Sequence, residues 1–186
     1  MMSSIVDVTY CTLEEAIWGT KAPREICAEL ELVEVRHYDF DKQVHRGQLV
    51  VHRELAGGLR KIFEALVNAR FPIERMIPIV HYEWDDARSM AANNTSAFNY
   101  RFVPGTDRLS HHARGRALDL NPFLNPCVNG TVVEPRGASY NPDRLGSIVR
   151  DGPVVQLFRM YGWQWGGVWN DPTDYHHFEY PGIYAT

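Results

Sequence analysis

Cysteine is scarce in this sequence, and the few cysteines form no recognisable pattern. Cys11, Cys27 and Cys127 are the three cysteines among 186 residues, and none of them belongs to a C-x-x-C pair. An odd number of scattered thiols argues against a disulfide framework and against a cysteine-rich metal site. We therefore expect all three to be buried thiols.

Excess positive charge and long apolar runs are also lacking. The chain has 19 Lys+Arg against 23 Asp+Glu, a formal net charge of −4, so no overall positive field attracts nucleic acid or an anionic membrane. No apolar run approaches the roughly 18 residues of a membrane span, and the first residues lack the features of a secretory signal. We expect no nucleic-acid partner and no membrane span. The compartment stays open, because a mature domain without its leader would look the same.

The sequence contains no repeat, no low-complexity segment and no linker rich in proline or glycine. A chain of 186 residues suits one compact unit. We expect residues 1–186 to form a single domain that is a monomer.

Hydrophobic spacing in the first half predicts both strands and helices. Residues 12–15 have the order of a helix capping box, and residues 30–35 and 48–52 alternate as the strands of a hairpin would. Apolar residues within 55–66 recur at helical spacing. Residues 77–80 contain a proline, which predicts an edge strand.

In the second half, the sequence predicts that residues 91–153 are rich in loops. Long loops in a compact domain are usually functional, so we expect the chemistry in this segment. Around them we expect a helix that begins after Asp85 and another from Pro153 to Gly162. Short strands are expected at 117–120, 163–165 and 177–180. These patterns predict an α+β fold with a small, mostly antiparallel sheet and flanking helices.

Two adjacent histidine pairs lie close to aspartates and suggest a metal centre. A catalytic zinc takes three protein ligands and leaves one position for water, whose pKa it lowers from 15.7 to about 7. His112 and Asp119 are seven residues apart with Gly115 between them, so a turn and a strand can bring both side chains together. The third ligand would come from His176 or His177. Asp174 is placed to act as a general base beside it.

The same residues carry a resemblance to a known family. Residues 110–119 read S-x-H-x-x-G-x-A-x-D, and residues 174–177 read D-x-x-H. Both patterns resemble signatures of the zinc D-alanyl-D-alanine carboxypeptidases and L-alanyl-D-glutamate endopeptidases, the VanY-like group. The resemblance extends to residues 93–101 and 163–167 and so covers most of the segment from about 90 to 180.

This resemblance implies roles for individual residues. His112, Asp119 and His177 would hold Zn²⁺, and Asp174 would be the catalytic base. Arg101 would match an arginine that stabilises the developing oxyanion. The implied fold is the small α+β domain shared with the hedgehog signalling domain.

Other residues near the motifs receive supporting roles. Glu179 alternates with His177 on a strand, so it can orient a ligand or a substrate group, and Ser110 can hydrogen-bond the substrate peptide. His111 and His176 should point away from the ligands beside them. Nearby arginines suit substrates that bear carboxylates; they are Arg101, Arg108, Arg114 and Arg116. The remaining histidines are interpreted as structural; they are His37, His45, His52 and His81.

Three functional classes have to be distinguished: a zinc peptidase, a non-catalytic zinc-containing binding module and an iron oxygenase. The favoured one is a zinc peptidase acting on the peptide stem of peptidoglycan, as a D-alanyl-D-alanine carboxypeptidase. An L-alanyl-D-glutamate endopeptidase of phage type and a non-catalytic zinc-containing binding module are the alternatives, and the presence of both Asp174 and Arg101 disfavours the binding module. An iron oxygenase is excluded, because its histidine and carboxylate are normally separated by one residue, whereas six intervene between His112 and Asp119.

Overall fold

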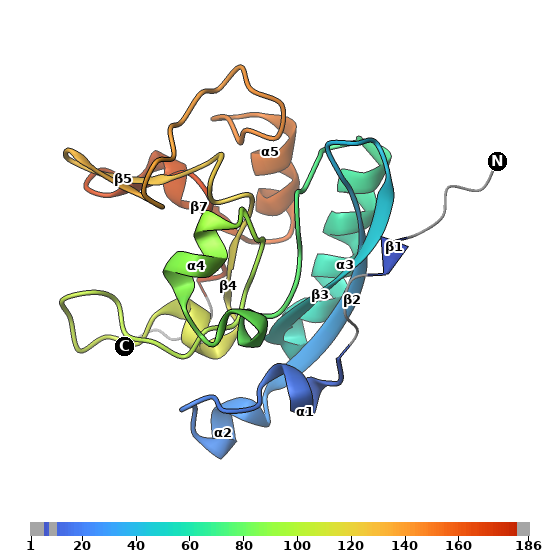
Figure 1. Cartoon of the computed structure of the whole chain (residues 1–186), viewed down its shortest axis with the longest axis vertical. Helices are drawn as coiled ribbons and strands as arrows, with labels where there is room; N and C mark the ends of the chain where they lie inside the picture. Colours follow the sequence, from blue (N-terminus) through green and yellow to red (C-terminus); the bar gives the residue numbers. More distant parts are fainter. Residues whose placement is uncertain (1–5, 8–10, 182–186) are drawn as a thin grey trace.

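The computed structural model describes residues 6–7 and 11–181 and has two structurally different parts (Figure 1). The hairpin part, residues 30–68, is a long β-hairpin packed against the longest helix. The loop-rich part, residues 91–181, contains short strands and helices joined by irregular segments (Figure 1). No helix within the described residues is both long and apolar enough to cross a membrane.

The helices, in chain order, are α1 (Leu13–Ala16), α2 (Arg24–Cys27), α3 (Arg53–Asn68), α4 (Asp86–Ala91) and α5 (Pro153–Met160), with 3-10 turns η1 (Ile79–Tyr82), η2 (His111–Arg114) and η3 (Gly166–Val168). The strands are β1 (Val6–Asp7), β2 (Leu30–Tyr38), β3 (Val44–His52), β4 (Ala117–Asp119), β5 (Cys127–Asn129), β6 (Val132–Glu134), β7 (Gln164–Trp165), β8 (Thr173–Asp174) and β9 (His177–Glu179).

The hairpin part forms as its hydrophobic pattern predicts. Strands β2 and β3 pair antiparallel, from Leu30 opposite His52 to Tyr38 opposite Val44. The apolar stripe of α3 packs on β2 and β3, and Leu59, Ile62 and Phe63 on that stripe are fully buried. The predicted hairpin and helix are therefore confirmed.

Within residues 6–7 and 11–181 the strands form three small sheets, where the sequence predicted one. Their orders are β1-β3-β2, β4-β9-β7 and β6-β5-β8, and every pairing except the parallel one of β1 with β3 is antiparallel. The mixed α+β composition with antiparallel pairing agrees with the prediction. The single sheet is wrong, because strands β4 to β9 are only two or three residues long and turns interrupt them before they can merge.

The edge strand predicted for residues 77–80 is also wrong. Ile79–Tyr82 form η1, which Pro78 begins with φ −57°. The backbone of Ile77 is satisfied by a side chain: its N–H donates to the Asn94 amide oxygen, and its carbonyl accepts from the Asn94 amide nitrogen, each at 3.0 Å. A buried asparagine thus replaces the neighbouring strand that the pattern suggested.

The helix signals at three other positions are confirmed. The capping box at Thr12 begins α1, the Asp85 side chain caps α4, and Pro153 starts α5. Gly162, just after α5, has φ +85°, the left-handed conformation expected there. The three cysteines are free, as predicted, but they are only partly buried.

The larger of two hydrophobic clusters among the described residues joins the two parts. It contains Leu49 from β3 and Phe63 from α3, and it continues through Leu118 of β4 to Phe158 of α5 and Phe178 of β9. The rings of Phe158 and Phe178 stack with centroids 4.0 Å apart. Strands β4 and β9, which carry predicted ligands, are therefore anchored in the shared core.

Candidate metal centre and active site

Local structure brings three predicted ligands together. Ser110 caps η2, which carries His112, and the chain then turns at Gly115 with φ +64° before entering β4. Asp119 ends β4 and lies directly opposite His177, the first residue of β9. The turn at Gly115 and the pairing of β4 with β9 therefore bring the three side chains together.

The three side chains present donor atoms at the spacing of a metal site. Nδ1 of His177 lies 3.0 Å from Oδ1 of Asp119, and Nε2 of His112 lies 3.3 Å from the same oxygen and 3.2 Å from Nδ1 of His177. Tetrahedral zinc with bonds of 2.0–2.1 Å separates its ligand atoms by about 3.3 Å. Two imidazoles and one carboxylate at these separations can hold one divalent ion.

Hydrogen bonds outside the cluster fix which ring nitrogens face inward. Nδ1 of His112 lies 2.6 Å from the carbonyl oxygen of Ala97 and donates to it, which leaves Nε2 as the inward lone pair. Nε2 of His177 lies 3.4 Å from Oε2 of Glu179, which leaves Nδ1 facing Asp119. A second partner of this kind is what holds ligating histidines in place at metal sites.

The electrostatics of the cluster favour positive charge. Burial alone would raise the pKa of Asp119, but the imidazoles of His112 and His176 and the hydrogen bonds to Asp119 hold its pKa well below the ordinary 3.8. Burial opposes charge on His177 as well, yet its hydrogen bonds to Asp119 and Glu179 raise its pKa to about 10. A buried carboxylate that stabilises a neighbouring cation in this way also suits a metal ion.

Asp174 lies next to this cluster on β8 and contacts His176. Nε2 of His176 is 3.0 Å from Oδ1 of Asp174 and 3.8 Å from Oδ1 of Asp119. The other ring nitrogen of His176, Nδ1, lies 2.8 Å from the carbonyl oxygen of Asn125. His176 is 3% exposed. The expectation that it points away from the site is therefore wrong, because it links Asp174 to Asp119.

His111 also stays close to the site instead of pointing away. Its Nε2 lies 3.8 Å from Oε2 of Glu179, which is the carboxylate that faces His177. Burial lowers the pKa of His111, and the charge of Glu179 partly offsets that effect.

Arg101 lies near the cluster through its backbone, while its guanidinium has another partner. The carbonyl of Arg101 accepts from the N–H of Ser110, which places it beside η2. Its Nη2 lies 3.0 Å from Oδ2 of Asp86, at the start of α4, and its Nε is buried without a hydrogen-bond partner in the described structure. The structure thus does not join Arg101 directly to His112, Asp119 or His177.

Two other predicted residues have local partners. The hydroxyl oxygen of Ser110 accepts from the N–H of His112, so Ser110 positions η2. Arg116 is buried and donates to Glu54 at 2.8 Å, beside His52, which removes it from the arginines available to substrate.

Several residues that support the site were not predicted. The Ala97 carbonyl orients His112, the Asn125 carbonyl orients His176, and the Trp169 ring lies 5.4 Å from that of His177. The many asparagines within residues 93–125 are the sequence signal for this support, because buried side-chain amides often form the hydrogen bonds that the backbone of a loop needs.

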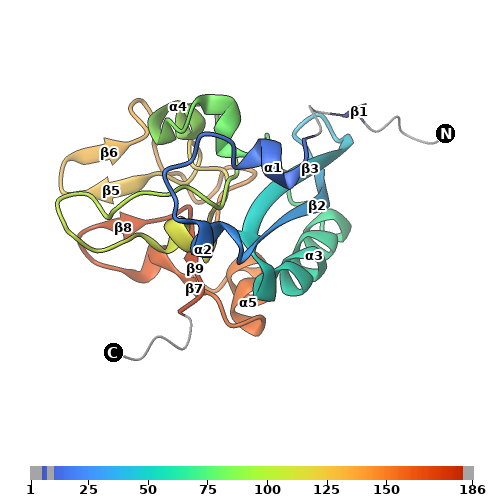
Figure 2. The same cartoon turned by 90° about the horizontal axis from the view of Figure 1, so that it is seen from below.

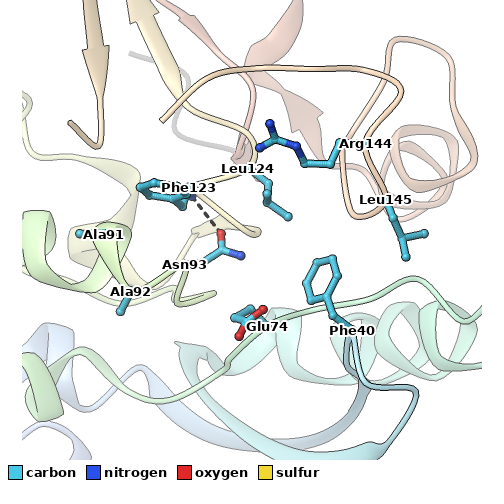
Figure 3. A pocket seen from close by; sticks show the side chains of 9 residues that line it. All are labelled: Phe40, Glu74, Ala91, Ala92, Asn93, Phe123, Leu124, Arg144 and Leu145. Atoms are coloured by element: carbon cyan, nitrogen blue, oxygen red, sulfur yellow. Dashed lines mark hydrogen bonds between the residues drawn. The ribbon is translucent and has the colours of Figure 1, made fainter. Parts of the chain in front are cut away.

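A cavity of about 460 Å³ opens elsewhere on the molecule (Figure 3). Phe40, Glu74, Phe123 and Arg144 are among its lining residues, and the amide of Asn93 accepts from the N–H of Phe123 at its wall (Figure 3). None of the predicted ligands or catalytic residues lines it. The candidate site is therefore the His112–Asp119–His177 cluster, and this cavity is separate from it.

Comparison with known proteins adds one match. The family described as D-alanyl-D-alanine carboxypeptidase matches residues 104–180, a segment that contains His112, Asp119, Asp174 and His177, whereas Arg101 precedes it. No curated protein and no solved structure matches the chain. Residues 104–180 are therefore similar to the D-alanyl-D-alanine carboxypeptidase family of peptidases.

Proposed function

We propose that this protein is a zinc metallopeptidase that hydrolyses the peptide stem of peptidoglycan, with D-alanyl-D-alanine carboxypeptidase as its activity. We further propose a VanY-like enzyme with the hedgehog-type fold, formed by one domain over residues 1–186. The convergence of His112, Asp119 and His177 inside the segment matched by the family carries this proposal.

The chain supplies a complete ligand set. Nε2 of His112, Oδ1 of Asp119 and Nδ1 of His177 would hold the ion, with Glu179 orienting the His177 ring. Bound zinc supplies a Lewis acid that acidifies water and polarises a peptide carbonyl.

Asp174 acts as the general base in this proposal. Its carboxylate accepts a proton from the attacking water and returns it to the departing amine, a role commonly worth about 10² to 10⁴ in rate. Oδ1 of Asp174 is buried 3.0 Å from Nε2 of His176 and makes no hydrogen bond within the described structure, so it has an acceptor position to offer a water molecule.

Arg101 stabilises the oxyanion that forms at the substrate carbonyl. Asp86 engages one end of its guanidinium, and its Nε is a buried donor without a partner in the described structure, so donors remain for substrate. Losing an oxyanion donor typically costs about 2.7 to 4 kcal/mol in the transition state. The hydroxyl of Ser110 still has its own proton to donate to the substrate peptide.

Digestion of muropeptides by the zinc-loaded protein tests this proposal. Mass spectrometry should show the loss of one terminal D-alanine, whereas cleavage between L-alanine and D-glutamate would identify an endopeptidase. Asp174→Asn should lower kcat by about 10² to 10⁴ while zinc content stays the same. Asp143→Asn, in an exposed loop, is the matched control. Full activity of Asp174→Asn would show that the base is another group.

A further inference from the structure

A second feature of the loop-rich part is an open groove between α4 and β6. Its volume is about 570 Å³, and its apolar wall includes Met90, Val133 and the buried Pro135. Figure 2 shows α4 beside β6, at the edge of the β6-β5-β8 sheet. Both walls of this groove lead to residues of the proposed active site.

The sheet wall leads to the proposed base. Cys127 on β5 pairs with Glu134 on β6 and with Asp174 on β8, so these three side chains emerge on the same face of the sheet. Adjacent strands are about 4.8 Å apart, which puts Glu134 about 10 Å from Asp174. The charges of Asp174 and Glu134 both contribute, after burial, to raising the pKa of the Cys127 thiol to about 12.

The helix wall leads to the proposed oxyanion donor. Helix α4 begins at Asp86, which pairs with Arg101, and continues through Ala87, Arg88, Met90 and Ala91 along the groove. A peptide whose cleaved bond lies between Asp174 and Arg101 would therefore extend into this groove. An extended chain advances about 3.3 to 3.6 Å per residue, so a side chain about two residues from the cleaved bond would reach it.

The groove carries one unpaired charge of each sign. Arg88 also lines the groove, but it is already paired, because its Nη1 lies 2.6 Å from Oε2 of Glu83. Glu134 and Arg136, two residues apart, are both exposed, and within the described structure no ion pair or hydrogen bond engages either side chain. An ammonium would complement Glu134, and a carboxylate would complement the guanidinium fork of Arg136.

The geometry points to a specificity subsite in this groove. The subsite binds the side chain of one substrate residue, and that side chain ends in a carbon that carries both an ammonium and a carboxylate. Such a residue would stand two places before the cleaved bond, its aliphatic stem against Met90 and Val133 and its charged end between Glu134 and Arg136. This inference rests on the proposed peptidase function and adds which substrate side chain the enzyme prefers.

Two synthetic stem pentapeptides test the subsite. They differ only at the third position, where one carries meso-diaminopimelate and the other lysine, which lacks the side-chain carboxylate. The zinc-loaded wild type should favour the diaminopimelate peptide about three- to tenfold in kcat/KM, chiefly through KM, as expected for one partly exposed ion pair. Arg136→Gln should remove that preference, and Glu134→Gln should raise KM for both peptides. Arg144→Gln, at the separate cavity, should keep the wild-type preference.

The outcomes separate this inference from the proposed function. Equal turnover of both peptides by the wild type, or a preference that survives in Arg136→Gln, overturns the subsite and leaves the peptidase proposal standing. Turnover of neither peptide overturns the peptidase proposal. In that case calorimetric binding of the same two peptides to the wild type and to Arg136→Gln decides the subsite: a wild-type preference lost in the variant supports it, and equal affinities overturn it.

Discussion

The hairpin part and the loop-rich part are stabilised in different ways. In the hairpin part, a nine-residue ladder and the apolar stripe of α3 satisfy the backbone and bury side chains such as Phe63. In the loop-rich part, buried asparagine side chains form many of the hydrogen bonds to backbone N–H and carbonyl groups. Asn125 alone donates to three carbonyls and accepts from the N–H of Ile148.

This difference relates to function. A regular ladder fixes the hydrogen-bonding direction of every residue, whereas loops held by side-chain amides can turn backbone groups toward a site. The carbonyl of Ala97 faces His112, and the carbonyl of Asn125 faces His176. The hairpin part thus provides a stable support, and the loop-rich part positions the chemistry.

Gly115 joins the two parts, and its replacement should have the largest effect on stability. A Cβ at this position would lie 2.6 Å from the backbone N of His52 and 2.8 Å from the backbone carbon of Val51, at φ +64°. Left-handed strain and overpacking together should cost Gly115→Ala about 4 kcal/mol of unfolding free energy. Urea denaturation measures this cost.

Gly130→Ala is the matched control for that change. Its φ is also positive, +56°, but a Cβ there would meet nothing within 4 Å. Its cost should be about 1 kcal/mol. If both variants lose equal stability, the close contact at Gly115 is not what joins the two parts.

The amide of Asn125 should show the next largest effect. Asn125→Ala leaves the buried N–H of Ile148 without its acceptor and removes donors from three carbonyls, which should cost about 3 kcal/mol. Asn141→Ala, which removes one exposed acceptor in the loop between β6 and α5, should cost less than about 1 kcal/mol. Similar thermal unfolding curves for the two variants would mean that buried amides do not stabilise the loop-rich part.

A smaller effect concerns pH and the hairpin part. Burial, and then the charge of His45, lower the pKa of His37 from 6.5 to about 4, although Asp39 opposes the shift. The unfolded chain therefore takes up this proton first as pH falls, and stability should drop by about 2 kcal/mol between pH 6.5 and 4. His37→Phe should flatten this part of the curve of unfolding free energy against pH. A curve as steep as that of the wild type would show that His37 is not the cause.

The sequence predicts the hairpin part better than the loop-rich part. Periodic burial and helix caps are local signals, so β2, β3, α3 and α5 follow from residues close together in the chain. The amide network is not local: Asn121 donates to the carbonyl of Pro72, 49 residues away. No spacing rule identifies such a partner, and the same holds for Asn94, whose pairing with Ile77 takes the place of the strand predicted at residues 77–80.

In the candidate site, too, local spacing predicts some features, whereas others depend on residues that are distant in the sequence. The spacing of His112 and Asp119 around Gly115 is local and was readily interpreted, whereas the choice of His177 depended on the family resemblance. The contact of His176 with Asp174 was missed for a structural reason. Strand β9 begins only at His177, so the alternation of a strand does not apply to His176.

Zinc content of the purified protein tests the central claim most directly. The wild type, measured by inductively coupled plasma mass spectrometry after dialysis, should contain about one zinc per chain, since three protein ligands and one water complete a tetrahedral site. Asp119→Ala should lose this zinc, whereas Asp143→Ala should keep it. A wild type that binds no zinc, or an Asp119→Ala variant that retains it fully, would contradict the metal centre proposed here.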